Sequence, residues 1–454
     1  MIYDVLVIGG GPGGYRAAER AGHKKMSVAL FESRSLGGVC LNEGCMPTKT
    51  LLYSAKLYDY AKGGASHYGV KSSATIDHAA VVARKDKIVK QLVSGVAMQM
   101  KEAKVTVVKG EAKVTGKTAN GFTVTANGET YEGKKLILAA GSSAAVPPIP
   151  GLKESVAAGI ALTNREILAL TEAPKKLIVL GGGVIGLEMA SYFNSIGTEV
   201  TVVEMMEKIA GPTDSEMSKM LQDIYSKRGV KFLLGTKATA VNGNKLSIEN
   251  KDGKSELSAD KILVSVGRRA NTANLGLETI GVYLERGAVV TDEQMKTNIP
   301  NVYAIGDING KSMLAHTAYR EAEVAVNVIA GERDTMVYTD IPSVIYTNPE
   351  IASVGETEET AKAKGLKTKT VKLPLMYSGR YIAENDGGNG FIKLILDQDK
   401  RILGAAMIGN PGSEMICAMA MAVTRKLTCA EFAKVVFPHP TVSEIFREAV
   451  ITQI

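Results

Sequence analysis

The segment Gly37–Lys49 reads GGVCLNEGCMPTK and is the most informative part of this chain. Cys40 and Cys45 stand five positions apart in it, among glycines. In a regular α-helix such residues have Cα atoms about 8–9 Å apart, which exceeds the roughly 7 Å that a disulfide tolerates. A bridge between the two cysteines therefore requires an irregular start of a helix. Gly44 relaxes the backbone at this point, and Pro47 has no N–H with which to extend the helical hydrogen bonds backwards.

The two cysteines are better suited to redox chemistry than to stabilising the fold. A disulfide across so short a loop contributes only about 2 kcal/mol in the loop-entropy model, whereas a helix N-terminus favours the thiolate of a nearby cysteine. We therefore predict a redox-active pair, with a structural bridge or two inert thiols as the alternative. No metal site is expected, because no second cysteine pair or nearby histidine completes a tetrahedral set and Cys417 and Cys429 stand apart.

The composition predicts an intracellular protein of several domains. At about 100–200 residues per domain, 454 residues correspond to roughly two to four domains. The net charge of +7 is small for this length, and no basic run with interleaved aromatic residues indicates a nucleic-acid surface. No signal peptide is recognisable, and no apolar run approaches the ~20 residues of a membrane span. We therefore expect a cytoplasmic protein that binds neither nucleic acid nor membrane.

The first residues carry a dinucleotide-binding fingerprint. The apolar run Tyr3–Ile8 is followed by GGGPGG at positions 9–14, by a helix predicted to reach about Arg20, and by a second strand, Ser27–Phe31. Strand, glycine turn, helix, strand and then an acidic residue, here Glu32, is the order that binds a dinucleotide. We therefore predict a nucleotide site rather than a plain glycine-rich turn.

Each part of this fingerprint has a physical role. Gly9 allows the tight turn, Gly11 admits the pyrophosphate to the helix N-terminus, and Gly14 lets the helix approach the strand. Glu32 is expected to accept hydrogen bonds from the hydroxyls of an adenosine ribose.

The fingerprint occurs a second time. The strand-like run Lys176–Leu180 leads into GGGVIG at 181–186, a helix predicted to end at Ser195, and a strand, Glu199–Val203, that is followed by Glu204. Two fingerprints predict two dinucleotides, and we expect FAD at one site and a nicotinamide dinucleotide at the other. Because a carboxylate at the ribose position repels a 2′-phosphate, Glu204 favours NAD over NADP.

The segments that follow the two fingerprints also resemble each other. After the largely helical stretch Leu51–Ala103, the alternating segment Val105–Glu132 predicts an antiparallel meander, and Lys135–Ser142 predicts a buried strand. In the second half, Lys245–Glu256 and Lys261–Gly267 repeat this order. We therefore predict an internal duplication.

The last part of the chain predicts an α+β unit that begins near residues 340–355. Lys369–Pro374 and Gly390–Asp397 have strand-like patterns, and Glu414–Lys426 and Cys429–Val436 have helical ones.

Two polar sites stand outside the fingerprints. Asn301–Asp307 predicts a strand whose acidic end either contacts a cofactor hydroxyl or is an ordinary turn residue. Further on, Phe437–Glu444 reads FPHPTVSE and holds His439 between two prolines. A carboxylate such as Glu444 raises the pKa of a nearby imidazole and orients it, which suits general acid–base catalysis. From these residues alone, His439 is either a catalytic base or part of a surface loop.

Taken in order, these segments resemble the pyridine nucleotide–disulfide oxidoreductases over essentially the whole chain. The cysteine segment is most similar to the dihydrolipoamide dehydrogenase branch of that family, with Met46 and Thr48 in place of the commoner isoleucine and serine. Phe437 replaces a histidine that is common two residues before the catalytic one. The resemblance implies an α/β fold with two Rossmann-like dinucleotide-binding domains and a C-terminal α+β dimerisation domain.

The resemblance also implies a division into domains, with an FAD-binding domain that is discontinuous in sequence. The expected boundaries are 1–145 for the first part of the FAD-binding domain, 146–268 for the NAD-binding domain, 269–338 for the second part of the FAD-binding domain (the central domain), and 339–454 for the interface domain.

Roles of individual residues follow from the same resemblance. Cys45 is implied to lie against the flavin and to form a thiolate–flavin charge-transfer pair, and Cys40 is implied to exchange with the dithiol substrate. Lys49 is implied to sit near the flavin N5 and to pair with Glu188.

The implied base is His439, oriented by Glu444 and acting on the disulfide of the other subunit. The functional unit is therefore expected to be a homodimer. The cofactor-binding residues implied by the fingerprints and the resemblance are Gly9, Gly11, Pro12, Gly13, Gly14, Glu32, Ser33, Gly38, Val39, Lys49, Ala112, Gly141, Ser142, Asp307, Met313, Leu314, Ala315, His316, Gly181, Gly183, Val184, Ile185, Gly186, Glu188, Glu204 and Gly267.

The implied activity is oxidation of protein-bound dihydrolipoyl groups to lipoyl, with FAD as cofactor and NAD as acceptor. The implied partner is a lipoyl-bearing protein of a 2-oxoacid dehydrogenase complex or of the glycine cleavage system. A relative that reduces another disulfide, mercuric ion or a quinone is an alternative, although Glu204, His439 and the lack of a cysteine pair in Ile451–Ile454 argue against it. A flavoprotein that only assists assembly is the second alternative, and it leaves both cysteines without a purpose.

Overall fold

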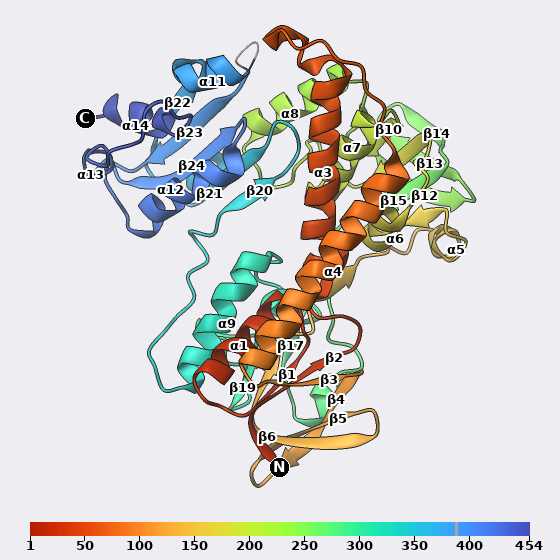
Figure 1. Cartoon of the computed structure of the whole chain (residues 1–454), viewed down its shortest axis with the longest axis vertical. Coiled ribbons are helices and arrows are strands. Elements are labelled where there is room, and N and C mark those ends of the chain that lie inside the picture. The colour runs from red at the N-terminus through yellow and green to blue at the C-terminus, as the bar shows by residue number, and fades with distance from the viewer. Residues whose placement is uncertain (386–388) are drawn as a thin grey trace.

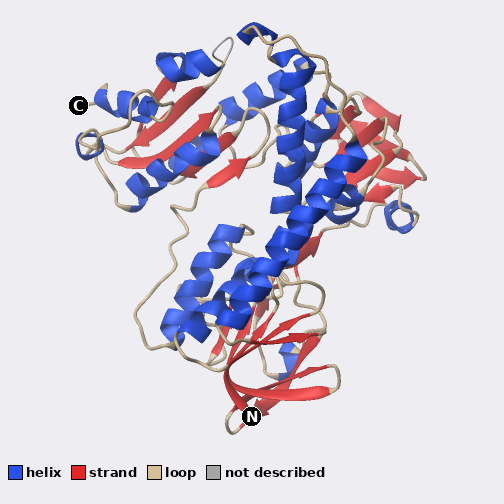
Figure 2. Cartoon of the chain, viewed as in Figure 1, coloured by secondary structure: helices blue, strands red, loops and turns tan. Residues whose placement is uncertain are grey.

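The computed structural model describes residues 1–385 and 389–454. Within these residues the strands form three larger sheets and three smaller ones, and helices lie against each of the larger sheets (Figures 1 and 2). No helix in the described ranges is long and apolar enough to cross a membrane.

The first sheet has the order β3-β2-β1-β6-β5-β4, with β19 beside β6. In β1, alternate side chains enter different hydrophobic clusters, because Val5 and Val7 pack on the side of α1 and α9 while Leu6 and Ile8 pack on the opposite face. Burial on both faces explains why the second half of this strand, Val5–Ile8, is apolar throughout. The elements are β1 (Ile2–Ile8), β2 (Val28–Glu32), β3 (Thr106–Lys109), β4 (Ala112–Thr118), β5 (Gly121–Ala126), β6 (Glu129–Leu138), β19 (Val302–Ala304), α1 (Pro12–His23), α4 (His78–Glu102) and α9 (Ala315–Ile329).

The second sheet is parallel and has the order β11-β10-β9-β15-β8, while a separate three-stranded sheet, β12-β13-β14, is antiparallel. A short antiparallel pair, β7 (Ser142–Ala144) with β16 (Arg268–Ala270), joins the ends of the first and second fingerprint regions. The elements are α5 (Leu152–Ala157), β8 (Ala161–Leu162), α6 (Asn164–Ala169), β9 (Lys176–Leu180), α7 (Val184–Ser195), β10 (Glu199–Val203), α8 (Ser215–Lys227), β11 (Lys231–Leu233), β12 (Lys237–Asn242), β13 (Lys245–Asn250), β14 (Gly253–Ser258) and β15 (Lys261–Val264).

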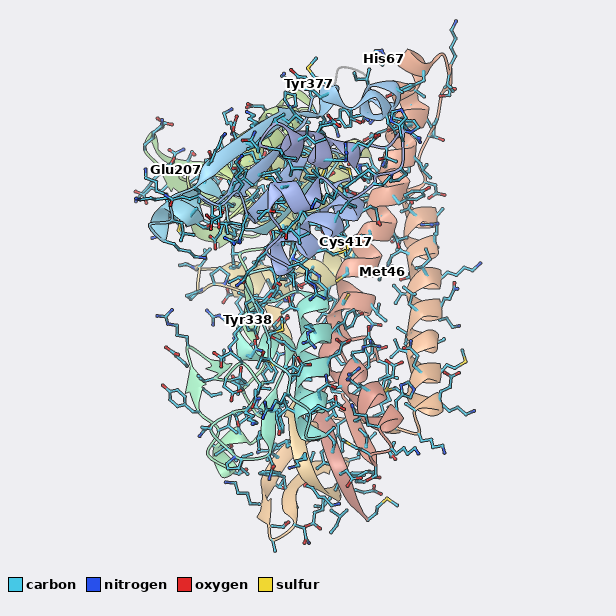
Figure 3. The ribbon with its side chains drawn as sticks, turned by 90° about the vertical axis from the view of Figure 1, so that its left-hand side faces the viewer. Met46, His67, Glu207, Tyr338, Tyr377 and Cys417 are labelled. Carbon is cyan, nitrogen blue, oxygen red and sulfur yellow. The ribbon has the colours of Figure 1, made fainter. Side chains whose placement is uncertain are left out.

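The C-terminal sheet is antiparallel with the order β20-β21-β24-β23-β22. The exposed Cys417 lies on α12 (Figure 3), and the buried Cys429 begins α13. The elements are β20 (Ser343–Ile345), β21 (Ile351–Gly355), α10 (Glu358–Ala363), β22 (Lys369–Pro374), α11 (Gly379–Glu384), β23 (Phe391–Leu396), β24 (Ile402–Ile408), α12 (Gly412–Thr424), α13 (Cys429–Phe432) and α14 (Glu444–Ile451).

The predicted duplication is incomplete at the meanders. The prediction of a meander ending at Glu132 and a separate strand Lys135–Ser142 is wrong, because β6 runs without a break and pairs with β5 on one side and β1 on the other. This strand ends at Leu138, and Gly141, with φ +69°, turns the chain into β7. In the second half, by contrast, the meander β12-β13-β14 is a sheet of its own.

The helical predictions need correction at one place. Leu51–Ala103 is largely helical as predicted, although α3 (Cys45–Asp59) passes into a π-helical turn at Tyr60–Gly64 and residues 69–77 are not helical before α4 begins. There the Asp77 carboxylate caps α4 by accepting a hydrogen bond from the Ala80 N–H at 3.0 Å. The correction is that α13 ends at Phe432 and not at the predicted Val436. The domain boundaries given above stay a prediction.

Candidate active site

Cys40 and Cys45 lie on two helices that meet at a glycine. Cys40 belongs to α2 (Gly38–Glu43), Cys45 begins α3, and Gly44 between them has the non-helical angles φ −146° and ψ −107°. The irregular helix start that the spacing requires is therefore present. Both cysteines are free thiols in this structure, and their sulfurs are hydrogen-bonded to each other.

The two thiols differ in acidity. The hydrogen bond from Cys40 is the largest influence on Cys45, burial opposes it, and the Lys49 ammonium and the N–H at the start of α3 also favour the thiolate, so the pKa of Cys45 falls to about 7. The same hydrogen bond, together with burial, raises the pKa of Cys40. Cys45 is therefore the better leaving sulfur, while Cys40 keeps its proton.

Lys49 and Glu188 form an ion pair next to the cysteines. The Lys49 Nζ lies 2.9 Å from each carboxylate oxygen of Glu188, which is the contact that the resemblance implies. Lys49 comes from the first turns of α3 and Glu188 from α7, where its side chain is almost completely buried. Tyr346, a residue that the sequence did not single out, lies with its ring centroid 4.1 Å from the ammonium.

One cavity of about 1870 Å³ contains both cysteines and both glycine turns. This volume exceeds the roughly 300–1,000 Å³ of an ordinary small-molecule site, so the space suits two large ligands. The predicted cofactor residues that line it are Gly9, Gly11, Pro12, Gly13, Glu32, Ser33, Gly38, Val39, Lys49, Ala112, Gly141, Ser142, Gly181, Gly183, Val184, Ile185, Glu188, Glu204, Gly267, Asp307, Met313, Leu314, Ala315 and His316.

Gly14 and Gly186 do not line the cavity. A Cβ on Gly14 would lie 1.7 Å from the Gly9 carbonyl oxygen, and one on Gly186 would lie 2.2 Å from the Gly181 oxygen. Both glycines therefore let a helix pack against the preceding turn. Gly183, in contrast, has no atom within 4 Å of where its Cβ would be, which leaves open space where a pyrophosphate is expected. The residues present thus fit two dinucleotides.

The two acidic residues of the fingerprints are held in the same way. Glu32 Oε2 accepts a hydrogen bond from the Gly10 N–H at 2.7 Å, and Glu204 Oε2 accepts one from the Gly182 N–H at 2.7 Å. The other oxygen of Glu204 accepts from the Met206 N–H. Each carboxylate is therefore fixed at the edge of its glycine turn, where a ribose hydroxyl can donate to it.

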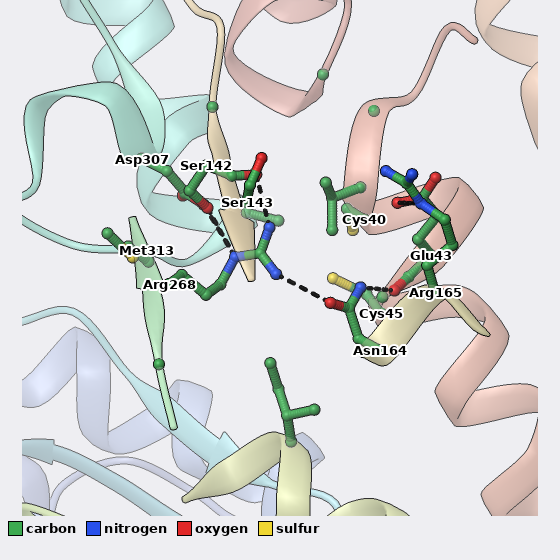
Figure 4. Close-up of a pocket in the computed structure, with 18 of the residues that line it drawn as sticks. Cys40, Glu43, Cys45, Ser142, Ser143, Asn164, Arg165, Arg268, Asp307 and Met313 are labelled. Atoms are coloured by element: carbon green, nitrogen blue, oxygen red, sulfur yellow. Dashed lines mark hydrogen bonds and ion pairs between the residues drawn. The ribbon is translucent and has the colours of Figure 1, made fainter. Parts of the chain in front are cut away.

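Asp307 belongs to a polar chain that crosses the cavity wall (Figure 4). Its carboxylate is hydrogen-bonded to Ser142 and lies 3.8 Å from Arg268, whose guanidinium also donates to the Ser142 hydroxyl at 2.7 Å. Asn164 continues the chain by donating to the Glu43 carbonyl oxygen at 2.7 Å, next to the cysteine pair. The sequence analysis missed Arg268 and Asn164. Arg268 follows the predicted strand Lys261–Gly267, so its place at the carboxyl end of a strand was the available signal.

His439 and Glu444 are brought together but do not line the cavity of the cysteines. The His439 Nδ1 lies 2.9 Å from Glu444 Oε1, and the Thr441 N–H donates to Glu444 Oε2 at 2.8 Å. These two contacts lower the pKa of Glu444. The His439 side chain is 81% exposed, so its ring is accessible from outside the chain. Among the described residues, no group of three or more acidic, cysteine or histidine side chains forms a metal site.

Comparisons with known proteins agree with this geometry. Residues 3–322 match the family described as pyridine nucleotide-disulphide oxidoreductase, and residues 341–450 match its dimerisation domain. The dihydrolipoyl dehydrogenase of Mycoplasma pneumoniae is 38% identical over 99% of this chain and 98% of its own length, and the mitochondrial one of Pisum sativum is 40% identical over 98% and 90%. The crystal structure of LpdA from Mycobacterium tuberculosis superposes with a TM-score of 0.90 at 26% identity, covering 99% of this chain and 100% of that one. The chain therefore belongs to the pyridine nucleotide-disulphide oxidoreductase family.

Proposed function

We propose that this protein is a dihydrolipoyl dehydrogenase, which oxidises a dihydrolipoyl group to lipoyl and reduces NAD, with FAD as cofactor. The observation that carries the proposal is the single cavity in which two glycine turns, the Cys40–Cys45 pair and the Lys49–Glu188 ion pair meet. The names of the relatives at 38–40% identity support the choice of substrate.

In the proposed reaction the thiols of this chain perform the exchange with substrate. His439 of the partner subunit takes the proton of one substrate thiol, and the resulting thiolate attacks the Cys40 sulfur of the oxidised pair. The Cys40–Cys45 bond breaks and Cys45 leaves as a thiolate, which the Lys49 ammonium and the N–H at the start of α3 favour. The second substrate thiol then passes its proton to the departing Cys40 sulfur, and its own sulfur displaces Cys40 to close the lipoyl disulfide, so the substrate loses two electrons and the cysteine pair gains them. Bound FAD supplies the electron transfer from the dithiol to NAD.

The residues around the first glycine turn would hold FAD, and those around the second would hold NAD. We infer that Asp307 contacts the ribityl chain of FAD and that the Lys49–Glu188 pair lies beside the flavin ring. The match of residues 341–450 to a dimerisation domain supports a homodimer, and the exposed His439, paired with Glu444, supports a base that acts across it. The physiological partner is then a lipoyl-bearing protein of a 2-oxoacid dehydrogenase complex or the glycine cleavage system.

The test is the rate of NADH formation from dihydrolipoamide and NAD by the purified flavoprotein. Robust NAD-linked activity is expected, with far lower activity when NADP replaces NAD or when oxidised glutathione and a reduced nicotinamide are offered. Activity with another disulfide alone would be consistent with the family but would contradict the proposed substrate.

Glu204 is expected to determine the preference for NAD. Replacing it with alanine (Glu204→Ala) removes a charged hydrogen-bond acceptor for the ribose, so kcat/KM for NAD should fall by about tenfold to 100-fold, which corresponds to about 1.5–3 kcal/mol. The value for NADP should rise, because the carboxylate no longer repels the 2′-phosphate. The measurement is kcat/KM for both nucleotides.

Glu207→Ala is the matched control for this prediction. Glu207 is an exposed carboxylate in the same loop but does not line the cavity, so its loss should leave the ratio of the two kcat/KM values unchanged. An unchanged ratio in Glu204→Ala would contradict the assignment of Glu204 to the ribose.

A further inference from the structure

Tyr346 contacts both members of the Lys49–Glu188 ion pair. Its ring centroid lies 4.1 Å from the Lys49 Nζ, and its backbone N–H donates a hydrogen bond to Glu188 Oε1 at 3.1 Å. The same carboxylate oxygen accepts from the ammonium at 2.9 Å. Tyr346, from the C-terminal part of the chain, therefore contacts an ion pair whose two members come from α3 and α7.

The loop that carries Tyr346 is anchored on the helix that carries Glu188. Tyr346 is the first residue beyond β20, the edge strand of the C-terminal sheet. Its backbone N–H is therefore available to a partner outside the sheet. Two residues later, the Asn348 N–H donates to the Tyr225 hydroxyl at 3.1 Å. That hydroxyl is hydrogen-bonded to Ser191 of α7 at 2.6 Å, and Ser191 is one turn from Glu188 on the same helix face.

The Tyr346 ring restricts the position of the Lys49 ammonium, which the Glu188 carboxylate alone does not fix. Glu188 contacts the Lys49 ammonium through both oxygens, but a carboxylate alone allows a flexible lysine to pivot around it. An aromatic face attracts a cation through its quadrupole and favours one position over the ring. Cys45, Lys49, Glu188 and Tyr346 all line the same cavity.

We propose that Tyr346 is a positioning residue of the redox site, whose ring and backbone N–H hold the Lys49–Glu188 ion pair beside the Cys45 sulfur. The ammonium favours the Cys45 thiolate and the carboxylate disfavours it, so the placement of the pair decides its net effect on the sulfur. A change at Tyr346 therefore alters the acidity of Cys45 without touching either cysteine. Any effect of a Tyr346 substitution on the rate of dihydrolipoyl oxidation rests on the proposed function. Its effect on the acidity of Cys45 does not.

The direct test is the rate at which iodoacetamide alkylates Cys45 in the reduced holoenzyme, followed by mass spectrometry across a pH series that brackets 7. In the unmodified protein the rate should rise through a pKa of about 7. Tyr346→Leu is expected to lower the rate at pH 6 by about threefold to tenfold, because loss of the cation–π contact loosens Lys49 and raises the pKa of Cys45. Tyr346→Phe keeps the ring and should stay within about twofold of the unmodified protein.

Tyr58→Leu is the matched control. Tyr58 contacts Lys62 with its ring centroid 4.9 Å from the Nζ, and it lies at the other end of α3, so its loss should not move the Cys45 profile. Tyr346→Met is a second non-aromatic variant if Tyr346→Leu does not bind flavin. An unchanged Cys45 profile in either non-aromatic variant overturns the proposal, whatever substrate the enzyme takes.

A double-variant cycle separates positioning from a general loosening of the site. If Tyr346 acts through Lys49, Tyr346→Leu should have no further effect on Cys45 alkylation in a Lys49→Met background. Full additivity of the two changes would overturn the proposal, because it would show that the ring acts on Cys45 by another route.

Discussion

A hybrid dimer of one Cys45→Ser subunit and one His439→Gln subunit should recover about half of the activity of the unmodified dimer, although both parent homodimers are nearly inactive. His439→Gln alone is expected to lower kcat by about 10²–10⁴-fold through loss of the general base. Recovery is expected because His439 does not line the cavity of its own cysteines and is 81% exposed. In the hybrid, one site combines intact cysteines from one subunit with an intact histidine from the other.

The opposite arrangement is the control, since it carries both substitutions on one subunit and none on its partner. If the base acts across the dimer, neither site of this second hybrid is complete and it should be nearly inactive. If the base acts within its own subunit, the two hybrids exchange their results. Differently tagged subunits allow each hybrid to be isolated, and NADH formation measures the activity.

Lys393→Ala should lower the free energy of unfolding by about 3–5 kcal/mol, because it leaves a buried carboxylate without its cation. Lys393 lies on β23 and is 5% exposed. Its Nζ is 2.9 Å from Asp214, which caps α8, and 2.8 Å from Glu358. Burial opposes the charge on Lys393, but its hydrogen bonds to three carboxylates outweigh burial and raise its pKa. Chemical denaturation followed by circular dichroism provides the measurement.

Two further variants give this prediction its controls. Lys372→Ala removes an exposed lysine that pairs with Glu216, and such a surface pair contributes only about 0–1 kcal/mol. In Lys393→Met/Asp214→Asn both buried charges disappear together while asparagine can still cap α8, so most of the lost stability should return. A Lys393→Ala variant no less stable than Lys372→Ala would show that Asp214 does not depend on the lysine.

The parts of the site that depend on short spacings were predictable from the sequence. The glycine turns, their acidic residues and the break between Cys40 and Cys45 are set by backbone geometry over a few residues. Tyr346 and Arg268 were not predictable in this way. Each contacts its partners only because β20 and β16 bring distant segments to the cavity, and the one local signal was the place of Arg268 directly after a predicted strand.

The continuity of β6 was hidden by a change in its surroundings. Residues 129–134 are mostly exposed or half-buried, whereas Leu136–Leu138 are buried on both faces, so the two halves have the patterns of different elements. Gly133 lies near the end of the first half, where a Cβ would be 2.5 Å from Leu6 Cγ. A glycine there permits close packing and not a turn. His439 was harder still to assign, because its contact with Glu444 fits a surface loop as well as a base and it does not line the cavity of the cysteines of its own chain.

The place of β19 in the first sheet has a consequence for folding during synthesis on the ribosome. β19 (Val302–Ala304) pairs with β6, and the whole second sheet, Ala161–Val264, is threaded between these two neighbours. During synthesis from the N-terminus, every strand of the second sheet is therefore made before the last strand of the first sheet exists. Because domains generally fold as units while the chain grows, the second sheet can complete its folding before the first sheet does. The edge of β6 that pairs with β19 stays unpaired until β19 is made, which takes roughly ten to thirty seconds of translation at about 5–20 residues per second.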